Sequence, residues 1–258
     1  MDEIARSRVI KFVVGPEKVE FNVHEASVTW LSRPLSALLT SGMQESVEAR
    51  VVWDDVEPGT FTKFLEYAYS GSFTVPDEEI QSKKRNFMSL RRKIKTHRLL
   101  TENLGPEFIY AIQHFEHCNA SSASSANAEA TSEANLSTTT AQSTMHSKTY
   151  YLAHARLYIL AEKYCIPVLR TLCVERVQQS LLDNPRERDL VFTLVDMIRY
   201  VWPRTMPNDA FRKLLLRYAI TNMRWIMSTR TFIKNLKDLP EVCQELLTMI
   251  PMTYWGLL

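Results

Sequence analysis

Glycine and cysteine are scarce in this chain of 258 residues. Its six glycines, at 15, 42, 59, 71, 105 and 256, form neither a dinucleotide-binding fingerprint nor a phosphate-binding loop. The four cysteines, at 118, 165, 173 and 243, include no C-x-x-C pair, which predicts reduced intracellular thiols. The G-x-S-x-G and HExxH signatures are also missing. We therefore predict that the chain is not an enzyme, has no cofactor and binds no small-molecule substrate.

Neither sign of charge dominates, since the formal net charge is +2 at pH 7. No overall field therefore indicates nucleic acid, a membrane surface or an acidic substrate as the partner. There is no apolar run of about eighteen residues, and the acidic N-terminus lacks the apolar core of a signal peptide. We expect a nuclear or cytoplasmic protein with no membrane contact. Its hydrophobic content of 45% is enough to bury a core without disulfides or metals.

The first forty residues predict a β-hairpin followed by two short helices. Two runs rich in β-branched and aromatic residues lie within 9–23, and the turn sequence at 15–17 joins them. Apolar residues then return at helical spacing over 25–40. Pro34 suits the first turn of a second helix, so two helices fit this segment better than one.

A third strand and a longer helix are predicted next. Residues 51–53, VVW, are typical of a short strand, and the residues after Pro58 follow a helical period. Gly71 is well placed to end that helix. The apolar face of the helix is expected to carry Phe61, Phe64, Leu65, Ala68 and Tyr69.

The composition changes after Pro76. Residues 83–98 carry eight Lys or Arg and no acid, which predicts a segment that faces water. Residues 119–147 are nearly all Ser, Thr, Ala, Asn and Glu, too polar to offset the entropy of folding. We predict that residues 77–149 form a basic, low-complexity insertion that is largely disordered.

Helical periodicity resumes at Tyr150 and continues to the end of the chain. Residues 150–182 predict a helical hairpin broken at Pro167. Beyond it, residues 183–258 predict a small all-helical domain in which Asn208 caps one helix and 242–250 form the last.

Taken together, four segments resemble a BTB/POZ domain of fungal type. They are FNVHEASVTWLSRPLSALL, SGMQES, VVWDDVEPGTFTKFLEYAYSGSF and LAHARLYILAEKYCIPVLRTLC. The resemblance implies an α+β fold with a short mixed sheet flanked by helices. The domain would be split between residues 1–76 and 150–182, and residues 183–258 would be the helical extension found after many such domains.

The chain departs from the family pattern at two places. It has Val9 where such domains usually have Asp at the start of the first strand, and His24-Glu25 where they have a His-Lys pair. These departures argue against the charged pocket at the dimer centre that is typical of BTB transcription factors. The sequence leaves open a homodimer that forms through apolar surface.

The resemblance also implies a protein partner. Met43-Gln44-Glu45 matches the hydrophobic-x-Glu loop through which family members that recruit a cullin insert an apolar anchor. Leu39 and Tyr69 are expected beside this surface, although the spacing of Tyr69 favours the core. The alternative for the loop is an ordinary polar connection. On the first interpretation the chain is an adaptor that recruits a target to a cullin-type ubiquitin ligase.

The basic run supports a second interpretation, a self-associating nuclear regulatory protein. Two basic clusters five residues apart resemble a two-part nuclear localisation signal. The alternatives are non-specific contact with nucleic acid and a solvated linker. We expect no base-specific recognition, because no zinc-finger or basic-zipper pattern follows. The candidate signal residues are Lys83, Lys84, Arg85, Arg91, Arg92, Lys93 and Lys95.

Two remaining groups of residues could carry chemistry. His24 occupies the family's usual His position, and we assign it a structural role at the turn from strand to helix. His114, His117 and Cys118 would share one side of a helix, but a fourth metal ligand is missing, so we predict no metal site.

Overall fold

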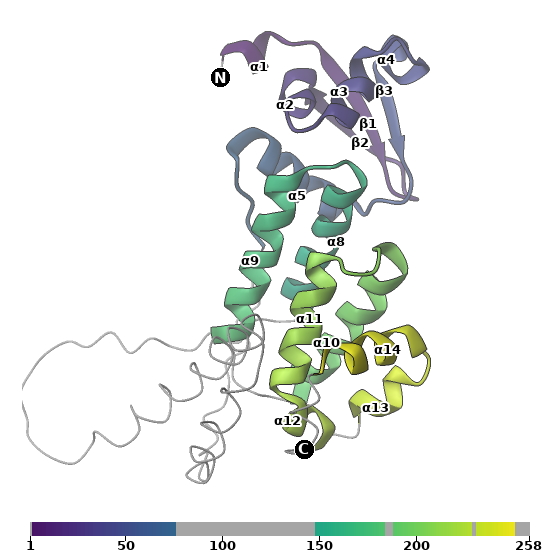
Figure 1. Ribbon diagram of the computed structural model, residues 1–258. Helices are drawn as coiled ribbons and strands as arrows, with labels where there is room; N and C mark the ends of the chain where they lie inside the picture. The colour runs from purple at the N-terminus through teal and green to yellow at the C-terminus, as the bar shows by residue number, and fades with distance from the viewer. Residues whose placement is uncertain (1, 76–147, 184–187, 229–230, 251–258) are drawn as a thin grey trace, which may run out of the picture. The chain divides into compact units, whose positions relative to one another are not determined.

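The computed structural model describes residues 2–75, 148–183, 188–228 and 231–250 (Figure 1). The basic run at 83–98, the low-complexity stretch at 119–147 and the His114–Cys118 group lie outside the described residues. The chain divides into two compact units, which are described separately below. Unit 1 comprises Met1–Asp77 and Leu152–Arg176, and unit 2 comprises Glu78–Tyr151 and Val177–Leu258.

Unit 1 is built on a mixed three-stranded sheet. Strands β1 (Val9–Val14) and β2 (Val19–His24) form the predicted antiparallel hairpin, and β3 (Arg50–Trp53) pairs with β1 in parallel, giving the order β2-β1-β3. Gly15 takes the left-handed conformation that the hairpin turn requires, with φ of 76°. A Cβ there would also lie 3.1 Å from the Pro58 ring, so only glycine suits both the turn and its neighbour.

Short helices follow the hairpin, as predicted. They are α2 (Glu25–Thr29) and α3 (Arg33–Thr40), with α1 (Asp2–Arg6) before the sheet. Ser32 caps α3 by accepting a hydrogen bond from the backbone N–H of Leu35, and Pro34 lies in the first turn. A further one-turn helix, α4 (Gln44–Glu48), lies where the sequence indicated only a loop.

Helix α5 (Pro58–Ser70) begins and ends where the sequence predicts. Gly71 ends it in the left-handed conformation, and its N–H donates to the Tyr67 carbonyl at 2.8 Å. The predicted apolar face is wrong at one position, because Tyr67 is buried whereas Tyr69 is exposed. Helix α5 buries Phe61 and Phe64 against Phe12 and Trp53.

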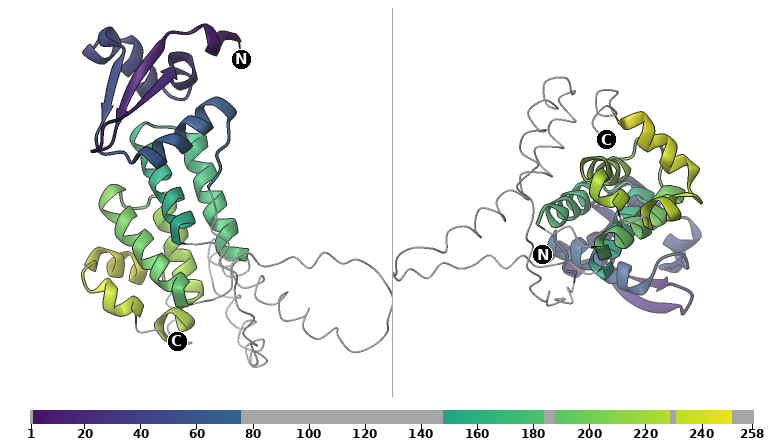
Figure 2. Two further views of the ribbon diagram at one scale, coloured as in Figure 1. Left: turned by 180° about the vertical axis from the view of Figure 1, so that it is seen from behind. Right: turned by 90° about the horizontal axis from the view of Figure 1, so that it is seen from below.

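The predicted helical hairpin is present as α8 (Lys148–Lys163) and α9 (Pro167–Asp183) (Figure 2). Its part within unit 1 closes the core, because the Tyr164 ring stacks on Trp53 with centroids 4.3 Å apart. Arg176 of α9 lies over the Phe73 ring and donates to the Phe73 carbonyl. Residues far apart in the sequence therefore share one core.

Unit 2 is helical in the residues described. It contains α10 (Arg188–Val201), the 3₁₀ turn η3 (Trp202–Arg204), α11 (Ala210–Thr221), α12 (Met223–Ser228), α13 (Thr231–Leu236) and α14 (Pro240–Met249). The expected cap at Asn208 is wrong by one residue. Asp209 caps α11, its carboxylate accepting from the N–H groups of Phe211 and Arg212, while Asn208 takes a left-handed backbone conformation before it.

Within the described ranges, no helix combines the length and apolar character needed to cross a bilayer.

Candidate functional site

Arg8, directly before β1, forms a network that joins the sheet to three helices. Its guanidinium donates from Nε to the Glu25 carboxylate at 2.5 Å, at the start of α2. Nη2 donates to the Leu39 carbonyl at 2.7 Å, in the last turn of α3, and Nη1 to the Ser46 carbonyl at 2.9 Å, within α4. One side chain therefore fixes the position of the connection between α3 and α4.

That connection carries the residues of the predicted cullin-type loop. Met43 has extended backbone at the start of α4 and is 51% exposed, whereas Glu45, in the first turn, is half-buried. Val47 lies four residues after Met43 and is 75% exposed. Residues four apart on a helix face the same side, so Met43 and Val47 together form an apolar surface.

Polar side chains border this apolar surface on α4. The Gln44 side chain donates to the Glu48 carboxylate at 2.7 Å, one helical turn further on. Ser46, between these two residues, is buried. An exposed apolar pair beside polar groups is the usual organisation of a protein interface.

The expectation for Leu39 needs correction. Its side chain is fully buried, so a partner cannot contact it in this structure. Leu39 packs beneath the surface instead, and only its carbonyl takes part in the network, as an acceptor for Arg8. The sequence could not separate these roles, because Leu38 and Leu39 are adjacent and either could face the core.

Tyr69 lies on the surface and contacts His24. Its hydroxyl accepts from the His24 backbone N–H at 3.0 Å and lies 2.9 Å from His24 Nδ1. Tyr69 is 42% exposed, so the core position favoured by its spacing is wrong. His24 contacts a side chain of α5 at the turn from strand to helix and makes no side-chain capping bond to α2.

The carboxylate of Glu25, the residue at the family's usual Lys position, forms an ion pair with Arg8. The backbone supports the same contact, because the Glu25 N–H donates to the Arg8 carbonyl at 2.9 Å. The carboxylate next to His24 is thus neutralised within the chain. Val9, at the usual Asp position, is half exposed and pairs with His24 across the hairpin.

Sequence reasoning did not identify Arg8, Val47 or Trp30 as surface features. Continuing the hairpin register by one residue beyond Val9 and His24 places Arg8 opposite Glu25, so the register alone could have found this ion pair. Val47 follows from the helical period once α4 is known. Trp30, 59% exposed at the end of α2, carries no local signal that separates it from core aromatics.

Three titratable groups of unit 1 have raised pKa values. Burial raises the pKa of the Cys173 thiol well above its usual range, despite the nearby Arg176 charge. Burial likewise raises the pKa values of Tyr67 and Tyr164, so all three groups are protonated at neutral pH. A protonated buried thiol is a poor nucleophile. Among the described residues, no group of three or more His, Cys, Asp or Glu side chains could hold a metal ion.

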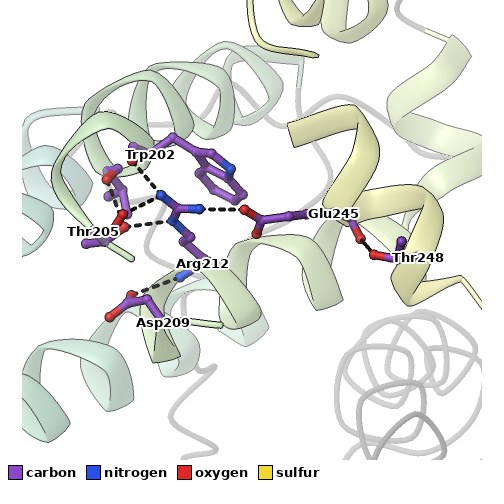
Figure 3. Close-up of polar contacts among 7 residues, drawn as sticks. Trp202, Thr205, Asp209, Arg212, Glu245 and Thr248 are labelled. Carbon is purple, nitrogen blue, oxygen red and sulfur yellow. Dashed lines mark hydrogen bonds and ion pairs between the residues drawn. The ribbon is translucent and has the colours of Figure 1, made fainter. Parts of the chain in front are cut away.

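Unit 2 contains a second arginine network, which is buried (Figure 3). Arg212 of α11 donates to the Glu245 carboxylate of α14 at 2.5 Å. It also donates to the carbonyls of Trp202 and Thr205 at 2.6 and 2.5 Å, and to the Thr205 hydroxyl at 2.8 Å. The guanidinium lies 5.0 Å from the centre of the Trp202 ring. These contacts connect η3, α11 and α14, and they assign Arg212 a structural role.

Comparison with known families identifies the N-terminal part of the chain. Residues 10–100 match the BTB/POZ domain family, a range that includes the sheet and helices α2 to α5. No curated protein matches the chain. The structure has the short mixed sheet with flanking helices of that fold, followed by a helical region. BTB domains mediate protein–protein contacts, including homodimers.

Proposed function

We propose that this BTB/POZ domain is part of an adaptor that binds a cullin-type ubiquitin ligase scaffold through Met43 and Glu45 and recruits a target to it. In this proposal the domain is split between residues 1–76 and 150–182, with 77–149 as an insertion. Residues 183–258 serve as the helical extension of a fungal-type BTB protein. The protein would work in the nucleus or the cytoplasm.

The observation that carries the proposal is the exposure of Met43 on a connection whose two flanks are held to the sheet by Arg8. An exposed methionine adapts its shape to an apolar pocket, and its burial stabilises a complex. Val47 enlarges the apolar area on the same side of α4, and Glu45 is near enough in sequence to add a polar contact.

Target recruitment requires a second surface. We propose that the helical extension or the insertion provides this surface. Met206 and Phe192 of unit 2 are exposed apolar residues that a target could cover.

The experiment is a binding titration of the full chain against a purified cullin N-terminal region. The Met43→Ala, Glu45→Ala double variant is expected to weaken binding by about thirtyfold, the effect of losing an interface hot spot. Met227→Ala is the matched control, because Met227 of unit 2 is 43% exposed, close to the 51% of Met43. Equal affinities for the wild type and the double variant would contradict the proposal, as would no binding by the wild type.

A second candidate function, a self-associating nuclear regulatory protein, is favoured by the exposure of Trp30 and Val9 on unit 1. A tryptophan exposed to this degree is typical of a surface that a partner covers. Light scattering across a concentration series would detect a dimer, and Trp30→Ala should shift the equilibrium toward monomer. An unchanged monomer at all concentrations would exclude self-association.

The nuclear part of this second candidate depends on the basic run. Its test compares the localisation of the wild type with a variant in which the run is neutralised. A neutralised variant that stays nuclear would contradict the import signal. The residues to change are Lys83, Lys84, Arg85, Arg91, Arg92, Lys93 and Lys95.

A further inference from the structure

We propose that Arg8 is a positioning residue that holds the Met43 surface in its binding conformation. The inference rests on the proposed function of that surface. Arg8 lies outside the surface itself, because its side chain donates to Glu25, Leu39 and Ser46 and not to Met43 or Glu45. Its two backbone acceptors, the carbonyls of Leu39 and Ser46, lie on either side of residues 40–45. The ends of the exposed segment are therefore fixed relative to one another through one guanidinium.

The geometry of arginine suits this role. A guanidinium presents its N–H groups in a rigid plane, so simultaneous bonds to two carbonyls fix the distance between them. The Glu25 carboxylate takes up the Nε–H, which orients that plane. Glu25 is in turn bonded through its backbone N–H to the Arg8 carbonyl. The orientation of the guanidinium is thus set by the hairpin, the most regular part of unit 1.

Another ion pair on the same strand provides a comparison. Lys11 contacts Glu20 at 2.9 Å, and both side chains are about as exposed as Arg8. Lys11, however, makes its ion pair within the hairpin and forms no hydrogen bond or ion pair with the described residues of α3 or α4. An exposed pair of this kind contributes little to stability or to shape. Arg8 and Lys11 therefore differ in the elements that they connect, although their side chains are similarly exposed.

Holding the segment affects binding through the population of the competent conformation. A partner that binds one conformation of a loop binds more weakly when that conformation is only part of the ensemble. Removing Arg8 frees two carbonyls and releases residues 40–45 from the sheet. The apolar side chains of Met43 and Val47 remain present but are no longer presented together.

The experiment measures two properties of the full chain in four variants. Affinity and association rate for the purified cullin N-terminal region are measured by surface-based binding kinetics. Amide hydrogen exchange is measured over residues 40–48. The variants are Arg8→Ala, Arg8→Lys, Glu25→Gln and the control Lys11→Ala, and circular dichroism verifies that each is folded.

We expect Arg8→Ala to weaken binding by about tenfold, mainly through a slower association rate, and to speed amide exchange over 40–48. Arg8→Lys should fall between it and the wild type, because one ammonium reaches only one of the two carbonyls well. Glu25→Gln should weaken binding less than Arg8→Ala, since both carbonyl contacts persist. Lys11→Ala should match the wild type in both measurements.

Other results would overturn the inference and would separate it from the proposed function. If Arg8→Ala binds like the wild type while the Met43→Ala, Glu45→Ala variant does not, the surface stands and the positioning role fails. If the wild type does not bind the cullin region, the proposed function fails. The positioning role is then judged by amide hydrogen exchange over residues 40–48. An exchange rate in Arg8→Ala equal to that of the wild type refutes the role, and a faster rate supports it. Should Arg8→Ala not fold, Arg8→Lys provides the same two readouts.

Discussion

Two arginines make nearly the same set of contacts in the two units, but their surroundings differ. Arg8 in unit 1 and Arg212 in unit 2 each donate to one carboxylate and to two backbone carbonyls. The Arg8 side chain is 42% exposed, whereas the Arg212 side chain is 4% exposed. Figure 3 shows the Arg212 guanidinium between Thr205 and Glu245, with the Trp202 ring beside it.

The difference shows that contacts alone do not determine what a residue contributes. A buried charged side chain needs all of its partners, because removing either member of a buried pair leaves the other charge buried and unpaired. An exposed charge exchanges its partners for water at low cost, so it changes local conformation more than global stability. We infer that Arg212 maintains the fold of unit 2, whereas Arg8 controls the shape of one surface of unit 1.

The largest expected effect that follows from this difference is the loss of Arg212. Arg212→Ala leaves Glu245 and two carbonyls without their donor, and we expect unit 2 to lose about 3–5 kcal/mol of unfolding free energy. Urea unfolding followed by circular dichroism measures it. Arg204→Ala is the control, because Arg204 is exposed and its polar and ring contacts among the described residues are with Tyr200. A loss below about 1 kcal/mol for Arg212→Ala would contradict the buried role.

Removing the charge of the partner carboxylate should have a smaller effect. Glu245→Gln keeps an acceptor for Arg212 but replaces a charged hydrogen bond by a neutral one. We expect a loss of about 1–2 kcal/mol in urea unfolding. Because Glu245 is more exposed than Arg212, water can compensate in part. If Glu245→Gln lost as much unfolding free energy as Arg212→Ala, the charge of Glu245 would contribute more to stability than the number of hydrogen bonds that Arg212 makes.

The helix cap before Arg212 is expected to rank third. Asp209→Ala removes the acceptor for the N–H groups of Phe211 and Arg212, which should cost about 1 kcal/mol. Asn208→Gly tests the neighbouring position, where the left-handed backbone favours glycine, so no loss is expected. Thermal unfolding of both variants distinguishes the two positions. If Asn208→Gly lowered the stability more than Asp209→Ala, Asn208 would be the helix cap, as the sequence predicted.

Local patterns were sufficient to predict most of the fold. Alternating β-branched residues, the Gly15 turn and the Pro34 and Gly71 boundaries each reflect a backbone preference that acts over a few residues. Those elements were confirmed. The one-turn helix α4 was not predicted, because five residues are too few to establish a helical period.

The candidate surface was only partly accessible to sequence reasoning. The Met43-Gln44-Glu45 motif pointed to a connection on which Met43 is exposed, and its role as a cullin-binding loop stays a prediction. Burial of Leu39 and exposure of Tyr69 depend on packing between elements far apart in sequence, which periodicity within one helix does not contain. The carbonyl partners of Arg8 were missed for the same reason, since they lie 31 and 38 positions away, whereas the hairpin register could have indicated its pairing with Glu25.

The smallest expected effect on stability is the loss of Arg8, although its effect on binding should be large. Arg8→Ala is predicted to lower the unfolding free energy of unit 1 by less than about 1 kcal/mol in urea unfolding. The Arg8 side chain is 42% exposed, so water can enter the space that it leaves and solvate Glu25 and the freed carbonyls. Lys11→Ala should give a similarly small change. A loss for Arg8→Ala equal to that for Arg212→Ala would remove the distinction between the two arginines. Arg8 would then maintain the fold of unit 1, and any loss of binding would be a consequence of unfolding.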